Sequence, residues 1–191
     1  MLSKEQILEN QKKFMEVNQK RKMFSDSLLE FLGESYFHAP ASSMLNLHNA
    51  FPGGLVDHSI KVCRNMIQLN KMLPTSMKQN EDSIYKVAFI SEIGKTFLYK
   101  ECKSEWHRKN QGKMYEFNDD LTSMRIGERS AYYAMTHGIT LIDEEFQAVL
   151  NTDKPIDDKQ AKWHGSVLSQ LLRQAIDVSI MIEQHEAATV E

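Results

Sequence analysis

The stretch HNAFPGGLVDHSIKVC, at residues 48–63, places a histidine directly after a turn-forming segment. Pro52, Gly53 and Gly54 predict a sharp turn, and the apolar spacing that follows predicts a helix carrying His58 near its start. An imidazole presented in this way is typical of a metal ligand. A divalent ion needs further imidazole or carboxylate ligands that converge on the same point. The rest of the chain must therefore supply the partners of His58.

The composition restricts the class of protein. The chain has 191 residues, which suits one domain, with 41% hydrophobic and 26% charged residues. No apolar run is long enough to span a membrane, and the polar start of the chain does not resemble a signal peptide. The two cysteines, Cys63 and Cys102, form no CxxC motif, which favours a reducing cytoplasm. The net charge of −3 does not favour nucleic acid as a partner.

Hydrophobic periodicity predicts a mostly α protein with a single domain. We expect a small β-hairpin insert at residues 97–118 that turns near Gly112. We also expect an N-terminal helical arm at 1–24, a helical domain at 25–186 and a frayed tail at 187–191. The predicted helices cover residues 4–22, 25–35, 55–73, 81–93, 120–137, 143–150 and about 159–186.

Five segments, in order along the chain, resemble the motifs of HD-domain metal-dependent phosphohydrolases of phage and bacterial type. They are HNAFPGGLVDHSIKVC (48–63), AFISEIGK (88–95), MRIGERS (124–130), LIDEEFQAVLNTDK (141–154) and LSQLLRQAID (168–177). The resemblance covers roughly residues 25 to 180 and implies an HD-domain-like helical bundle. It also implies that His48 shapes the loop, and that relatives hold one or two divalent metals which activate a water and clamp a phosphate.

The positions that the resemblance assigns to metal ligands mostly carry other residues here. They are His58, Ser91, Glu92, Ile126, Thr152 and Ile176. His58 is kept and Glu92 could in principle coordinate, whereas serine, threonine and isoleucine are poor or impossible ligands. Asp177 lies beside Ile176, and the register of this last motif is open between the two. We therefore expect a vestigial metal site, without a cofactor and without catalytic residues.

Two functions follow from this pattern. The first is a catalytically inactive HD-fold protein, or pseudoenzyme, encoded by a phage or mobile element and acting in the host cytoplasm. It would bind a host or viral protein, or a nucleotide. The alternative is a nucleotide phosphohydrolase with a rebuilt, sparse Mg²⁺ or Mn²⁺ site made of His58, Glu92, Asp153 and Asp177.

Two further sets of residues are candidates for binding. Basic side chains pair with phosphate oxygens, so the pocket could hold an anion without catalysis. The anion-binding candidates are His58, Lys95, Arg125 and Arg173. A partner protein would dock on the basic N-terminal segment or on the aromatic insert. These candidates are Lys12, Lys13, Lys20, Arg21, Lys22, Trp106, Tyr115 and Phe117.

Overall fold

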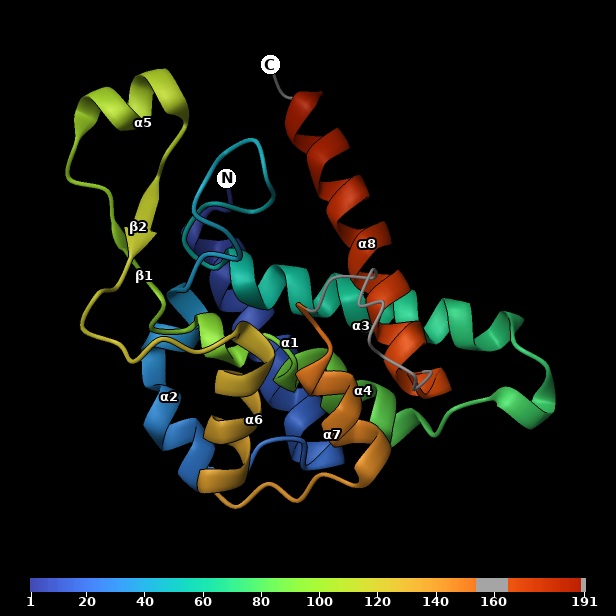
Figure 1. Cartoon of the computed structure of the whole chain (residues 1–191). Coiled ribbons are helices and arrows are strands. Elements are labelled where there is room, and N and C mark those ends of the chain that lie inside the picture. The colour runs from blue at the N-terminus through green and yellow to red at the C-terminus, as the bar shows by residue number, and fades with distance from the viewer. Residues whose placement is uncertain (154–164, 190–191) are drawn as a thin grey trace.

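The computed structural model describes residues 1–153 and 165–189, and within them the chain is mostly α, as predicted (Figure 1). The α-helices are α1 (Lys4–Arg21), α2 (Asp26–His38), α3 (Gly54–Met72), α4 (Glu81–Ile90), α5 (Glu105–Gln111), α6 (Ile126–Thr136), α7 (Asp143–Leu150) and α8 (Val167–Ala188). Short 3-10 turns cover Thr75–Met77 and Ile93–Lys95. None of the described helices combines the length and the apolar character that crossing a membrane requires.

The N-terminal helix shares the main hydrophobic core. Ser3 and Gln6 form the predicted capping box at the start of α1. Phe14 is fully buried, and its ring meets those of four other aromatic residues edge-on at centroid distances of 5.0 to 5.7 Å. These partners are Phe24, Tyr36, Phe37 and Phe89. The predicted arm at 1–24 therefore packs into the same core as residues 25–186.

Helix α3 lies at the centre of the fold and carries His58. It packs most extensively against α8 and α4, and also against α1 and α2. Figure 1 shows α8 crossing α3 and continuing upward toward the C-terminus, with α4, α6 and α7 below α3. The buried face of α3 includes Leu55, Val62 and Met66, so the apolar spacing in the sequence orients the helix. His58 and Ser59 lie on this buried face among the apolar residues.

The insert at residues 97–118 differs from the predicted hairpin in its connection. Strands β1 (Tyr99–Glu101) and β2 (Tyr115–Phe117) pair antiparallel, as expected. However, the residues between them form α5 instead of a tight turn at Gly112. The side chain of Ser104 accepts from the His107 backbone, and Gly112 ends the helix with φ +63°. Helix α5 stands at the tip of the insert, away from the helical body (Figure 1).

Some predicted helix boundaries move in the structure. The helix predicted from residue 120 begins at Ile126, because Asn118 forms a turn in which its side chain accepts from the Asp120 backbone. Helix α7 covers the predicted range, with Ile142 as its N-cap. The beginning of the last predicted helix, at 159–164, lies outside the described residues. At its other end α8 continues to Ala188, into the predicted frayed tail, of which residues 190–191 are also outside.

Candidate functional site

A tight turn between α2 and α3 determines the position of His58. Gly53 has φ +81°, a conformation that favours glycine, and a Cβ on Gly54 would clash with the backbone oxygen of Asn49. The Leu55 amide donates to the carbonyl of Ala39 at 3.0 Å, which ties the start of α3 to the end of α2. The predicted turn is therefore present. It places His58 in the second turn of α3, with 1% of the residue exposed.

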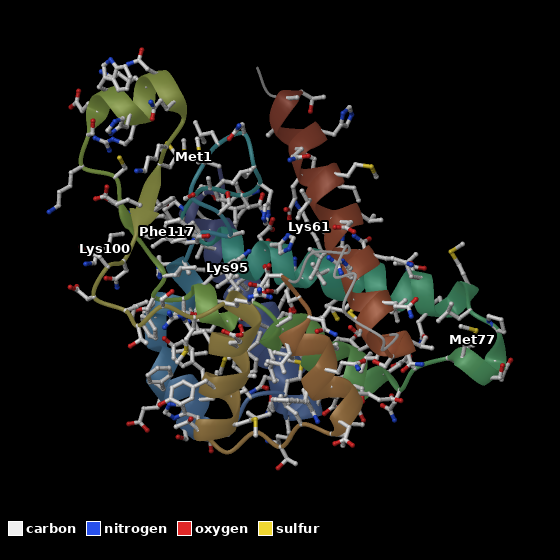
Figure 2. The ribbon with its side chains drawn as sticks, in the orientation of Figure 1. Met1, Lys61, Met77, Lys95, Lys100 and Phe117 are labelled. Carbon is white, nitrogen blue, oxygen red and sulfur yellow. The ribbon has the colours of Figure 1, made fainter. Side chains whose placement is uncertain are left out.

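Glu183 of α8 joins both histidines of the opening motif. Its Oε2 atom accepts from Nδ1 of His58 at 2.9 Å and from Nδ1 of His48 at 3.1 Å. Its Oε1 atom accepts from the Asn49 side chain at 2.9 Å. Lys61 lies on the more exposed side, with its Nζ atom 3.7 Å from Oε1 (Figure 2). The loop before α3, α3 itself and the C-terminal half of α8 thus meet at one carboxylate.

This contact network controls the charges of the cluster. Burial raises the pKa of Glu183, but hydrogen bonds from His48 and His58 outweigh it and lower the pKa to about 2. Burial lowers the pKa of His48, although its hydrogen bond to Glu183 opposes the shift. Glu183 is therefore ionised at neutral pH and can only accept hydrogen bonds. The Nδ1 atom of each histidine must carry a proton.

Glu92 approaches His58 from the opposite side. Its Oε2 atom lies 3.5 Å from Nε2 of His58, and its Oε1 atom accepts from Nζ of Lys95 at 2.7 Å. Burial raises the pKa of Glu92, but the charges of Lys95, His58 and His48 outweigh it and lower the pKa. Lys95 is itself only 5% exposed and lies near the middle of the molecule (Figure 2). A cation supplied by the chain therefore already neutralises this carboxylate.

Several polar atoms in this region are buried without a hydrogen-bond partner among the described residues. They are the side-chain oxygens of Tyr36, Ser91 and Thr96, together with Nε2 of His58 and Oε2 of Glu92. If His58 is neutral, its Nε2 lone pair faces the carboxylate oxygen of Glu92, and two buried acceptors repel one another. A proton on Nε2, or a cation between the two atoms, removes this repulsion. The site can thus hold a proton or a single cation.

The same residues do not fit a two-metal centre, the larger of the two kinds of site that the sequence resemblance implies. Ligand atoms of His48, His58 and Glu183 lie within 4.8 Å of one another, which could suit one ion. However, Glu183 is already hydrogen-bonded to three side chains, and Lys95 cancels the charge of Glu92. A second ion would need ligands from the remaining motif positions, and those positions carry none.

The structure places each of these remaining positions in a structural role. Ser91 is buried at the end of α4, and Ile126 begins α6. The hydroxyl of Thr152 donates to the carbonyl of Ala148 at 3.3 Å. Ile176 is buried within the hydrophobic core cluster. These four side chains offer a divalent ion two hydroxyl groups and no imidazole or carboxylate.

The two carboxylates of the rebuilt-site hypothesis also point to other partners. The carboxylate oxygens of Asp153 accept from the backbone amides of Ile126 and Gly127 at 3.1 and 3.3 Å. Asp153 therefore caps the N-terminus of α6, where the free amides and the helix dipole favour a negative charge. Asp177 is exposed on α8, while its neighbour Ile176 is buried. Of the four residues proposed for that site, the structure brings together His58 and Glu92.

The anion-binding candidates are only partly brought together. Lys95 and His58 lie on two sides of Glu92, so the nearest negative charge to Lys95 comes from the chain itself. Arg125 is exposed and lines a different cavity, of about 410 Å³, together with Asp153 and Phe117. Arg173 is half-buried on α8 and has interactions of its own. A single phosphate pocket formed by all four residues is not evident from these contacts.

The candidate partner surface divides into two parts. On α1, Lys13 pairs with Glu9 at 2.7 Å, and Arg21 pairs with Glu81 and Asp82. Lys12, Lys20 and Lys22 are exposed. On the insert, Trp106 is 60% exposed and Phe117 is 65% exposed, whereas Tyr115 is buried. Figure 2 shows Phe117 on the insert beside Lys100. The insert thus carries two large exposed aromatic residues.

Sequence reasoning missed Glu183, although a signal was present. Glu183 follows Ile176, the expected position of the closing ligand, by seven residues. Seven residues make about two helical turns, so both side chains lie on one face of α8. A carboxylate at this spacing was the feature to look for. His48, which we expected to shape the loop, also contributes its ring to the cluster.

Comparisons with known proteins place the chain in no family. No protein-family model matches it, and no curated protein or solved structure shows significant similarity to it.

Proposed function

We propose that this chain is a noncatalytic HD-like protein that acts by binding another protein. The observation that carries the proposal is the closed ion-pair network around His58. His58 is 1% exposed, Glu92 is held by Lys95, and Glu183 is held by His48 and His58. A hydrolase must bring a phosphoester to its metal-bound water. This buried site provides no access, and its charges are paired internally except at Nε2 of His58 and Oε2 of Glu92.

The insert is the surface that best suits a partner. Trp106 and Phe117 expose more than half of their surface on an element that stands away from the body. Aromatic side chains are enriched at the centres of protein interfaces, where they supply large apolar contacts at low entropic cost. The basic residues of α1 are less suited to docking, because Arg21 already pairs with Glu81 and Asp82 of this chain.

The experiment compares partner capture by the full chain and by a double variant of the insert. Trp106→Ala with Phe117→Ala should leave the melting temperature nearly unchanged, since both side chains are exposed, but should abolish capture of a specific protein from the native cell. Met72→Ala is the matched control, because Met72 is 80% exposed on α3. Capture that survives the double variant would contradict the role of the insert.

Catalysis is tested separately. The purified chain, supplied with Mg²⁺ or Mn²⁺, should release no phosphate from nucleoside mono-, di- or triphosphates. Turnover that disappears in a His58→Gln variant and remains in a His107→Gln variant would overturn the proposal. His107 lies in α5 on the insert, so it provides a histidine substitution outside the cluster.

A second candidate function rests on the two facing acceptors, Nε2 of His58 and Oε2 of Glu92. One divalent ion with ligand distances of about 2.0 to 2.2 Å could bridge two atoms that are 3.5 Å apart. The chain would then be a metal-dependent phosphohydrolase with a sparse site. Imidazole favours Mn²⁺ or another transition metal over Mg²⁺. Elemental analysis after purification without chelator decides the matter: one ion per chain, lost in His58→Gln, would favour this candidate.

A further inference from the structure

A groove separate from the His58 cluster lies between α1, α3 and α4. Its volume is about 340 Å³, within the range of small-molecule sites. The apolar part of its lining comes from all three helices and consists of Phe14, Val17, Ile60, Cys63, Ile67 and Phe89. Phe14 is fully buried and Phe89 is 3% exposed, while Val17, Ile60 and Ile67 are half-buried. The groove therefore has a rigid floor in the core and accessible apolar walls.

Both charged residues that line the groove are cationic. Arg64, on α3, is exposed and forms no ion pair within the described part of the chain. Lys13, on α1, pairs with Glu9, but both side chains of that pair are more than half exposed. Such surface pairs contribute little and exchange readily with other anions. No carboxylate is among the described residues that line the groove, so an anion there would meet two positive charges, one of which, Lys13, is shared with Glu9.

The thiol of Cys63, which lines the groove, is unreactive. Cys63 is 4% exposed, and burial raises its pKa to about 12. It remains a neutral thiol at physiological pH and behaves as a small apolar group. The groove thus provides apolar contact on its inside and positive charge at its exposed edge.

We propose that this groove binds a small amphipathic anion, with its apolar body against Phe14, Ile60 and Ile67 and its anionic group beside Arg64 and Lys13. The volume suits one small molecule. Because Arg64 and Lys13 are positively charged, the head group of the ligand is negatively charged. This ligand site is independent of the proposed partner surface on the insert.

The test uses the full chain and the aromatic sulfonate anilinonaphthalene sulfonate as a fluorescent probe. Wild type should bind one probe per chain with saturation. Arg64→Glu should weaken this binding about fivefold or more, because the substitution replaces an attractive charge by a repulsive one. Lys78→Glu is the matched control, because it changes the net charge equally at an exposed residue outside the groove, and it should bind as wild type does.

Displacement of the probe identifies the chemistry of the ligand. Decanoate should displace it, whereas decylammonium, with the same chain and the opposite charge, should not. Equal probe affinity in Arg64→Glu and Lys78→Glu would overturn the proposal, as would equal displacement by the two decyl compounds. A concentration-dependent dimer that blocks the probe in wild type, measured by sedimentation, would also overturn it, because a second copy would then occupy the groove. Since Arg64 is exposed, none of these outcomes depends on a variant that fails to fold.

Discussion

The Nδ1 atom of His58 donates a hydrogen bond of 2.9 Å to the Oε2 atom of Glu183, across 125 positions of the sequence. This bond links the helix that follows the Pro-Gly-Gly turn to the second half of the last helix. It also assigns the Nδ1 proton of His58 and turns Nε2 toward Glu92. The charge state of the buried cluster therefore depends on Glu183, and the first predictions concern this residue.

Replacing Glu183 should destabilise the fold. In a Glu183→Gln variant, His48 and His58 lose the charge to which both donate, and we expect a loss of about 3 kcal/mol in the free energy of unfolding. Urea denaturation measures it. Glu186→Gln is the matched control on the same helix. Glu186 is exposed and pairs with Lys61, so this change should stay within about 0.5 kcal/mol. Equal effects of the two variants would show that the cluster adds no stability.

The same carboxylate predicts a dependence of stability on acid. The pKa of Glu183 falls from 4.5 to about 2 on folding, so its ionised form stabilises the native state above pH 4.5. That contribution is lost as the pH decreases from 4.5 toward about 2. The difference in unfolding free energy between wild type and Glu183→Gln should therefore shrink over this interval. Unfolding curves at several pH values measure it, and a difference that stays constant would contradict the assigned charge.

Removing the charge of Lys95 should destabilise the fold only while Glu92 is present. Lys95→Met leaves the buried carboxylate without its partner at 2.7 Å, which should cost about 3 kcal/mol of unfolding free energy. The double variant Lys95→Met with Glu92→Leu removes both charges and should recover most of this loss. Lys100→Met provides the control, because Lys100 pairs with Asp119 and Asp120 at the surface and should change stability by less than about 1 kcal/mol.

A substitution of Asp153 distinguishes a structural role of this residue from a metal-binding role. Asp153→Ala removes the acceptor of two amides at the start of α6 and should cost about 1 kcal/mol in a thermal or urea unfolding measurement. It should not alter metal content or any phosphatase activity. Asp119→Ala is the stability control, because the carboxylate of Asp119 is exposed and pairs with Lys100 at the surface. A loss of bound metal in Asp153→Ala would instead support Asp153 as a metal ligand, as the rebuilt-site hypothesis has it.

The sequence predicted the helices that have strong apolar periodicity. The helix expected at 55–73 is observed at 54–72, because a turn signal precedes it and apolar residues line its buried face. It did not predict α5, although Ser104, Glu105 and Gly112 form the usual start and end signals of a helix. The aromatic residues on both sides of this segment favoured strands, and the short helix between them was overlooked.

The candidate site was predicted at His58 and Glu92 but not at Glu183. Position-by-position comparison assumes that a ligand keeps its place in a motif, whereas a helix offers equivalent places one or two turns away. Residues two turns apart on α8 face α3 together only at some crossing angles of the two helices. The local sequence does not encode this angle. The charge of Glu183 also depends on its burial and its partners, which are established only once the helices are packed.

The pairing of β1 with β2 allows the insert to vary in evolution while the helical body stays the same. Tyr99 pairs with Phe117 at the base of the insert, so the chain leaves the helical body and returns to it at neighbouring points. The segment between these two residues forms a cassette with fixed ends, which is also held by backbone hydrogen bonds of Gly112 and Met114 to Leu45 and Ser43. A new cassette could be installed by recombination without repacking Phe14 or disturbing Glu183. If the insert binds a partner, as we propose, a new cassette would change the binding specificity while the core remains the same.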